Sequence, residues 1–133
     1  MNTTKQHNKS PYLAVIDDET DIVYLFKEAL SKINGIKVFG FSDPSLALAH
    51  FQTNHESYRV VISDYKMEPM TGIELLGKVK DINPSVTRIL ISAFEIQDEL
   101  DRDGEYVDKF LKKPVSMTEL INEVQKLVAN NSI

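Results

Sequence analysis

The sequence predicts an α/β fold, a doubly wound parallel sheet of five strands with helices on both faces. Short, continuously apolar runs such as Leu13–Ile16 and Val60–Ile62 are typical of strands that are buried on both sides. The segments between them carry apolar residues every three to four positions, which is the period of an amphipathic helix. Strands that alternate with helices build βαβ units, and βαβ units produce a parallel sheet.

Each element has its own local signal. We expect strands at 12–16, 36–41, 59–64, 86–92 and 107–112. Helices are expected from about 22 to 33, from Pro44 to about 54, and from 73 to 82. A short, weakly held helix broken near Gly104 is expected in the acidic stretch 95–108, followed by a last helix with Ser116 as its N-cap. Two apolar faces are predicted to point inward: Ile22, Leu25, Phe26, Ala29, Leu30 and Ile33 in the first helix, and Leu46, Leu48, Ala49 and Phe51 in the second.

Composition limits the classes of function. A chain of 133 residues is one domain, and its net charge of −5 argues against direct binding of nucleic acid or of an anionic membrane. Cysteine is absent, and no apolar run approaches the ~20 residues of a membrane span. We therefore expect a cytoplasmic protein with a disordered tail at 1–10 and a folded domain at 11–133.

Polar residues follow four of the predicted strands. Asp17 and Asp18 come after the first, Asp64 ends the third, Ser92 ends the fourth and Lys113 follows the fifth. Because the carboxyl ends of parallel strands meet at one edge, these side chains are expected to converge where such sheets bind ligands.

The converging groups indicate phosphoryl chemistry. Three carboxylates a few Å apart repel one another, and a hard cation such as Mg²⁺ removes that repulsion. Mg²⁺ and a lysine together suit a phosphoryl group, whose transfer depends on positioning and charge stabilisation. Each residue also has a structural interpretation, since the acidic pair can cap a helix and Ser92 can simply end a strand.

The sequence resembles the receiver domains of two-component response regulators, of the single-domain type that is similar to the chemotaxis regulator. The resemblance covers residues 12–130. It rests on Asp17-Asp18, Asp64 with Gly72 eight residues later, Ser92-Ala93, and Phe110-Leu111-Lys112-Lys113-Pro114. It implies a flavodoxin-like strand order of 2-1-3-4-5 and a cis bond before Pro114.

The resemblance also implies the roles of the site residues. Asp64 would accept a phosphoryl group from a histidine kinase or a phosphotransfer protein, and Lys113 would contact the phosphoryl oxygens. Mg²⁺ would be held by Asp17, Asp18, Asp64 and the backbone carbonyl of Lys66. On phosphorylation Ser92 would move toward the new group and Phe110 would turn inward. The chain would then not be an enzyme beyond its own phosphorylation and dephosphorylation.

Partners and kinetics are expected to follow from the same resemblance. A downstream protein would bind the face made by the fourth helix, the fifth strand and the fifth helix, and the acidic stretch 95–108 suggests that this protein is basic. The chain would be a monomer or a phosphorylation-dependent dimer. The loop departs from the family pattern at Met67-Glu68-Pro69, and we expect Lys66 and Phe94 to slow loss of the phosphoryl group.

Two alternatives have lower support. One is a phosphatase resembling the haloacid dehalogenase superfamily with Asp17 as nucleophile, but that family requires Asp-x-Asp after the first strand, whereas this chain has Asp17-Asp18-Glu19. The other is a receiver-like module that binds proteins without being phosphorylated.

Overall fold

The computed structural model describes residues 10–130, so the predicted tail lies outside the described residues apart from Ser10. The strands are β1 (Tyr12–Ile16), β2 (Lys37–Phe41), β3 (Tyr58–Asp64), β4 (Thr87–Ser92) and β5 (Lys109–Lys112). The helices are α2 (Thr20–Leu30), α3 (Pro44–Asn54), α4 (Gly72–Ile82), α5 (Gln97–Asp103) and α6 (Met117–Asn130), with a 3₁₀ turn η1 (Gly104–Tyr106) after α5.

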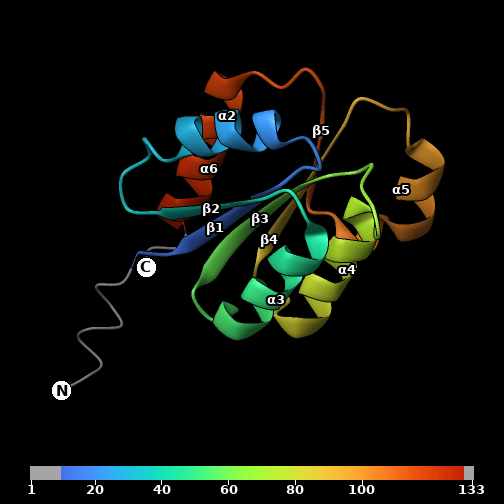
Figure 1. Cartoon of the computed structure of the whole chain (residues 1–133), viewed down its shortest axis with the longest axis horizontal. Coiled ribbons are helices and arrows are strands. Elements are labelled where there is room, and N and C mark those ends of the chain that lie inside the picture. Colours follow the sequence, from blue (N-terminus) through green and yellow to red (C-terminus); the bar gives the residue numbers. More distant parts are fainter. Residues whose placement is uncertain (1–9, 131–133) are drawn as a thin grey trace.

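The five strands form one parallel sheet in the order β2-β1-β3-β4-β5. Helices α2 and α6 cover one face of the sheet, and α3 and α4 cover the other, while α5 stands at the β5 end (Figure 1). The predicted fold class and strand order are therefore confirmed.

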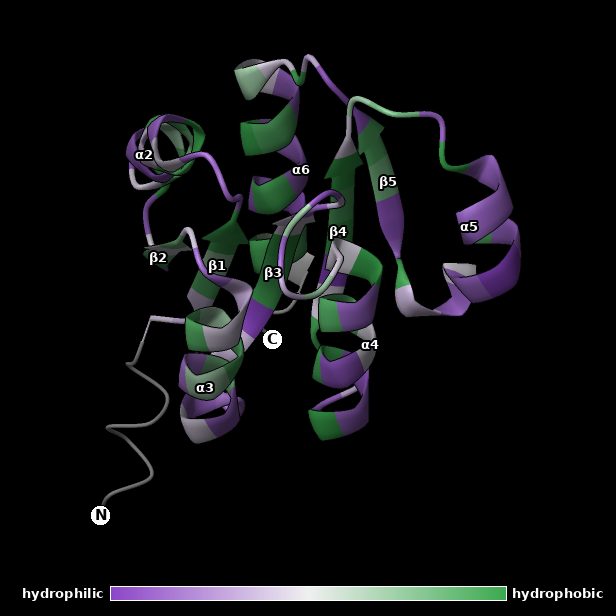
Figure 2. Ribbon diagram, turned by 45° about the vertical axis from the view of Figure 1, so that its right-hand side comes forward, coloured by the Kyte–Doolittle hydropathy of each residue, from purple (hydrophilic) through white to green (hydrophobic). Residues whose placement is uncertain are grey.

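Alternate residues of the central strands feed two separate cores, one on each face. Leu13 and Val15 of β1 pack with α2 and α6, whereas Ala14 and Ile16 pack with α3 and α4. Burial on both faces explains why the strand sequences are continuously apolar. Figure 2 shows apolar central strands between the helices, and a strongly hydrophilic α5.

Three predicted inward-facing residues point to solvent instead. Leu25 is 58 % exposed, Leu46 is 62 % exposed, and Ala49 is exposed as well. The buried residues follow narrower stripes with spacings of three and four, namely Val23, Phe26 and Leu30 in α2, and Pro44, Ala47 and Phe51 in α3. The predicted stripes were too wide because the residue type alone does not distinguish an apolar residue at the edge of a helix face from one that is buried at its centre.

A buried arginine at the start of β4 holds the segment that precedes β5. Arg88 is 5 % exposed, and its guanidinium donates to the carbonyls of Tyr106 and Val86, at 2.9 Å each, and forms an ion pair with Asp108 at 3.4 Å. Asp108 thus pairs with β4 before the ladder begins, so β5 starts at Lys109 rather than at the predicted residue 107.

The start of α4 lies very close to the end of β3. A methyl group added at Gly72 would lie 2.1 Å from the backbone oxygen of Asp64 and 2.8 Å from a methyl carbon of Leu90. Only glycine allows this approach. Thr71 then caps α4 through a capping box with Glu74, which fixes the loop between Asp64 and α4 at its far end.

Replacing Gly72 by alanine should therefore destabilise the fold and displace the end of β3. We expect Gly72→Ala to lower the free energy of unfolding in urea by about 1–3 kcal/mol through overpacking. Gly104→Ala is the matched control, because a methyl group there meets no atom within 4 Å. Equal stability of the two variants would contradict the proposed close contact.

Candidate functional site

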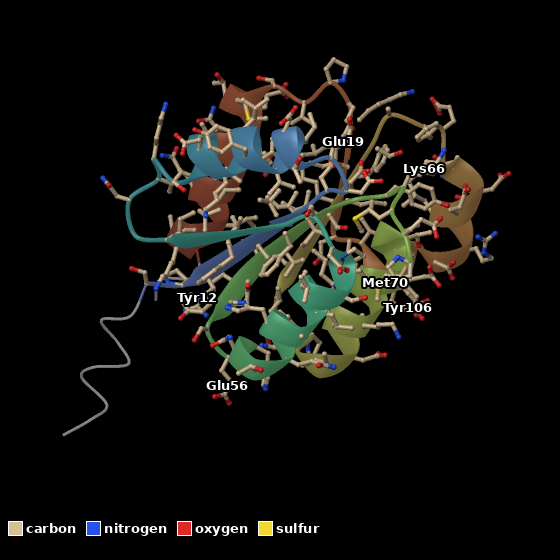
Figure 3. The ribbon with its side chains drawn as sticks, in the orientation of Figure 1. Tyr12, Glu19, Glu56, Lys66, Met70 and Tyr106 are labelled. Carbon is tan, nitrogen blue, oxygen red and sulfur yellow. The ribbon has the colours of Figure 1, made fainter. Side chains whose placement is uncertain are left out.

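The five predicted polar residues lie at the carboxyl end of the sheet. Figure 3 shows Glu19 and Lys66 at this end of the molecule and Tyr12 and Glu56 at the opposite end. Carboxylate oxygens of Asp17, Asp18 and Asp64 all lie within 4.8 Å of one another. The structure therefore brings together three carboxylates at the carboxyl ends of two adjacent strands, β1 and β3, as the topology predicts.

Lys113 joins the two strands at this edge. Its Nζ lies 3.0 Å from Oδ2 of Asp17 and 3.0 Å from Oδ1 of Asp64, although the three residues come from the segment after β1, the end of β3 and the segment after β5. The backbone N–H of Lys113 donates to the carbonyl of Ser92 at 2.9 Å, which continues the β4–β5 pairing up to the site. The Lys113–Pro114 bond is cis as predicted, and Glu68–Pro69 is a second cis bond that was not predicted.

Asp17 serves the local fold and the site at once. It is 2 % exposed, and its Oδ1 accepts the backbone N–H of Glu19 at 3.0 Å while Oδ2 faces Lys113. Asp18 is exposed beside it. Asp17 thus fixes the turn before α2, but the acidic pair does not cap that helix, because its N-cap residue is Glu19 and no side chain makes a capping hydrogen bond there.

Burial and neighbouring charges set the protonation behaviour of the site. Burial, together with the negative charges of Asp17 and Asp18, raises the pKa of Asp64 despite the opposing effect of Lys113. Burial alone would lower the pKa of Lys113, but its hydrogen bonds to Asp17 and Asp64 outweigh burial and raise that pKa. Lys113 therefore carries a positive charge at neutral pH and reduces the repulsion between the two carboxylates.

The cluster of three carboxylates formed by Asp17, Asp18 and Asp64 suits a hard divalent cation. Clustered carboxylate oxygens are the ligands that Mg²⁺ takes in proteins, usually with several waters. Asp18 and Asp64 also border an open hollow of about 400 Å³, which leaves room for waters and for a phosphoryl group. The residues at this edge therefore fit Mg²⁺.

Ser92 and Lys66 both contact Phe94 at the mouth of the hollow. Oγ of Ser92 accepts the backbone N–H of Phe94 at 2.9 Å, and Nζ of Lys66 lies 5.0 Å from the centre of the Phe94 ring. Phe94 itself is 51 % exposed. Phe110, the predicted switch residue, lies on β5, is partly buried and packs against the core on the α3–α4 side.

One contact next to Asp64 was missed by the sequence analysis. The hydroxyl of Tyr65 donates to a carboxylate oxygen of Glu99 on α5, at 3.4 Å. No sequence pattern reports this pair, because the two residues are 34 positions apart and their contact depends on where α5 lies. It connects the residue after Asp64 to the acidic helix.

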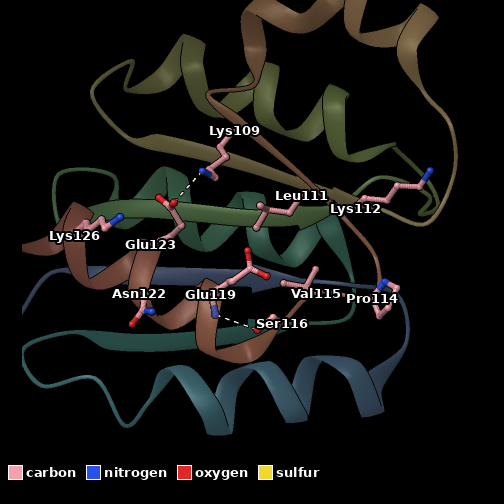
Figure 4. Close-up of a pocket in the computed structure, with 10 residues that line it drawn as sticks. All are labelled: Lys109, Leu111, Lys112, Pro114, Val115, Ser116, Glu119, Asn122, Glu123 and Lys126. Carbon is pink, nitrogen blue, oxygen red and sulfur yellow. Dashed lines mark hydrogen bonds and ion pairs between the residues drawn. The ribbon is translucent and has the colours of Figure 1, made fainter.

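A second hollow, of about 380 Å³, lies between β5 and α6 (Figure 4). Two of its three lysines form ion pairs: Lys109 with Glu123 at 2.9 Å, and Lys112 with Glu95. The three carboxylates of the site do not line it. We therefore place the functional site at the carboxyl edge of the sheet.

None of the helices between residues 10 and 130 has the length and apolar character that a membrane crossing requires.

The fold is shared with solved receiver domains. A response regulator receiver domain protein from Clostridium thermocellum is 29 % identical with a TM-score of 0.81, covering 90 % of this chain and 95 % of that one. A CheY-like receiver protein from Methanospirillum hungatei JF-1 is 21 % identical with a TM-score of 0.82, covering 92 % and 96 %, and it shows the fold alone.

Relatives are found at the sequence level too. The receiver protein CpdR of Brucella abortus is 27 % identical over 117 residues, covering 87 % of this chain and 95 % of CpdR. The transcriptional regulatory protein YesN of Bacillus subtilis is 34 % identical over 89 residues, but these cover 59 % of this chain and only 24 % of YesN. The family model of the response regulator receiver domain matches residues 13–125. The chain therefore belongs to the receiver domain family of two-component response regulators.

Proposed function

We propose that the chain accepts a phosphoryl group on Asp64 from a histidine kinase or a phosphotransfer protein, in a reaction that requires Mg²⁺. Receiver domains act with such donors, and two of the relatives, from Vibrio campbellii and Vibrio harveyi, carry the name sensor kinase/phosphatase LuxN. The observation that carries the proposal is the position of Lys113, whose ammonium contacts Asp64 directly while Asp17 holds it in place.

The chemistry follows from these contacts. A carboxylate oxygen of Asp64 attacks phosphorus, and the new O–P bond forms as the P–N bond of the donor's phosphohistidine breaks. The imidazole leaves with the electron pair of that bond. Lys113 meets the negative charge of the phosphoryl oxygens, and Asp17, Asp18, Asp64 and the backbone carbonyl of Lys66 are the proposed Mg²⁺ ligands. When bound, Mg²⁺ neutralises charge on those same oxygens.

The experiment is incubation with Mg²⁺ and acetyl phosphate, followed by intact mass spectrometry. We expect the wild type to gain the mass of one phosphoryl group and Asp64→Asn to gain none. Asp108→Asn is a control, because that carboxylate pairs with Arg88 away from the site. A gain that persists in Asp64→Asn would rule out Asp64 as the acceptor.

The contacts of Asp17 do not favour a phosphatase with Asp17 as nucleophile. Both of its oxygens are engaged, one by the N–H of Glu19 and one by Lys113, and the residue is 2 % exposed. Asp64 is the less buried carboxylate and borders the open hollow. We propose accordingly that the chain acts on itself alone and is not a turnover enzyme.

We propose further that Lys66 slows loss of the phosphoryl group. Its side chain lines the hollow beside Asp64, next to Phe94, and there it hinders an attacking water. We expect Lys66→Ala to lose phosphate several times faster than the wild type in a mass-detected time course at fixed Mg²⁺. Lys78→Ala, which removes an exposed lysine from α4, should leave the rate unchanged. An unchanged rate in Lys66→Ala would refute this role.

The apolar groove beside the site is a suitable docking surface for the protein donor. Exposed Leu25 and partly buried Ile22 of α2 face Pro114 and Val115 across a hollow of about 670 Å³ that also reaches Lys113. A donor bound there would place its phosphohistidine beside Lys113 and Asp64.

Leu25 should therefore matter for protein donors only. The donor is the histidine kinase that phosphorylates the wild type fastest. We expect Leu25→Glu to reduce the rate of phosphoryl transfer from this kinase about tenfold. The same variant should accept phosphoryl from acetyl phosphate at the wild-type rate. Leu46→Glu, on the opposite face, is the matched control. Equal loss with both donors would show a defect in folding rather than in docking.

The downstream partner is proposed to be basic and to bind the face made by α5, β5 and α6. Residues 95–105 contain six carboxylates and one arginine, a net charge of −5, which equals that of the whole chain. The formal charges of the remaining residues sum to zero, so the excess negative charge of the sequence lies in the segment 95–105. The chain is proposed to be a monomer, or to dimerise when phosphorylated.

Binding of that partner should weaken with salt. Raising the ionic strength from about 0.05 M to about 0.5 M shortens the screening length several-fold, so affinity should fall steeply. Replacing Asp98 and Asp101 by asparagine should reduce this salt dependence, whereas replacing Glu28 and Asp81, outside the segment, should not. Calorimetric titration at the two salt concentrations would measure both effects, and a salt-independent affinity would contradict the proposal.

A further inference from the structure

We infer that Phe94 is a positioning residue that engages both Ser92 and Lys66 in the unphosphorylated chain and is released by both when Asp64 is phosphorylated. This inference rests on the proposed function of Asp64. It concerns the partner that Ser92 and Lys66 contact before phosphorylation, which is Phe94. It makes Phe94 a reporter of phosphorylation separate from Phe110.

The first contact is between Ser92 and the backbone of Phe94. Oγ of Ser92 accepts the N–H of Phe94 at 2.9 Å and lies 3.4 Å from the carbonyl oxygen of Phe94, to which it donates. Ser92 is 1 % exposed, so its hydroxyl has few alternative partners. A serine has one hydroxyl hydrogen, so a hydroxyl that donates to a phosphoryl oxygen no longer donates to the Phe94 carbonyl. The movement of Ser92 toward that oxygen also draws Oγ away from the N–H of Phe94.

The second contact is between Lys66 and the Phe94 ring. The ammonium lies 5.0 Å from the ring centre, within the range of a cation–π interaction. Because the ring is half-exposed, this interaction is weak. A phosphoryl group adds a charge of about −1.5 to −2 beside Lys66, and the attraction between opposite charges exceeds the attraction of the ring. Lys66 then moves from the ring to the phosphoryl oxygens.

Both contacts of Phe94 thus end with the same chemical event. The residue is two positions before Ile96, a 3 % exposed residue at the start of α5, so a change at Phe94 reaches that helix directly. The helix itself has no buried residue, and the ion pair between Lys112 and Glu95 holds the intervening segment from the side of β5. Phe94 therefore links phosphorylation to the position of the acidic surface.

The chain contains no tryptophan, so Phe94→Trp provides a single fluorescent reporter at this position. We expect its emission to shift to longer wavelength, and its quenching by acrylamide to increase, on addition of Mg²⁺ and excess acetyl phosphate. Phe94→Trp combined with Lys66→Ala should show part of the shift before phosphorylation. Leu46→Trp, at a similarly exposed position on α3, should show no change.

Intact mass measured on the same samples separates the possible failures. A phosphoryl mass gain without a change in the emission of Phe94→Trp overturns the inference and leaves the function of Asp64 standing. Absence of a mass gain overturns both. As a second measurement on the wild-type chain, the backbone amide of Phe94 should exchange with solvent faster after phosphorylation, because its hydrogen bond to Ser92 is lost, and unchanged exchange contradicts the release.

Discussion

The contact of one ammonium group with two carboxylates organises the functional end of this protein. Lys113 lies 3.0 Å from both Asp17 and Asp64, and these residues belong to three different parts of the sheet edge. Without that positive charge, the buried Asp17 and the half-buried Asp64 would repel each other and destabilise the ends of β1 and β3. In the proposed reaction the same charge would also meet the phosphoryl group, so one residue would have both a structural and a chemical role.

The fold and this site could be predicted because both follow from strand ends. Apolar runs identify the strands, parallel topology places their carboxyl ends on one edge, and the polar residues there are adjacent in space whatever the helices do. Helix faces were harder to predict, as Leu25 and Leu46 show, since their exposure depends on how each helix sits on the sheet. The burial of Arg88 could not be predicted either, because its guanidinium donates to carbonyls of η1 and of the loop before β4.

The contacts made by the loops around the site could not be predicted from the sequence. Lys66 and Phe94 lie on different loops, and their contact depends on the paths of both. Tyr65 and Glu99 form another link between loop and helix. Together these contacts connect the neighbours of Asp64 to α5, where the net negative charge of the chain is concentrated. A change at the proposed acceptor therefore has a short physical route to the surface proposed for the partner.

The most direct measurement of the central claim locates the phosphoryl group chemically. An acyl phosphate is reduced by borohydride to an alcohol, which converts a phosphorylated aspartate into homoserine. The chain treated with Mg²⁺ and acetyl phosphate, reduced and digested, should yield homoserine at position 64 and unmodified aspartate at positions 17 and 18. Homoserine at position 17 or 18, with aspartate intact at position 64, would contradict the assignment of Asp64 as the acceptor.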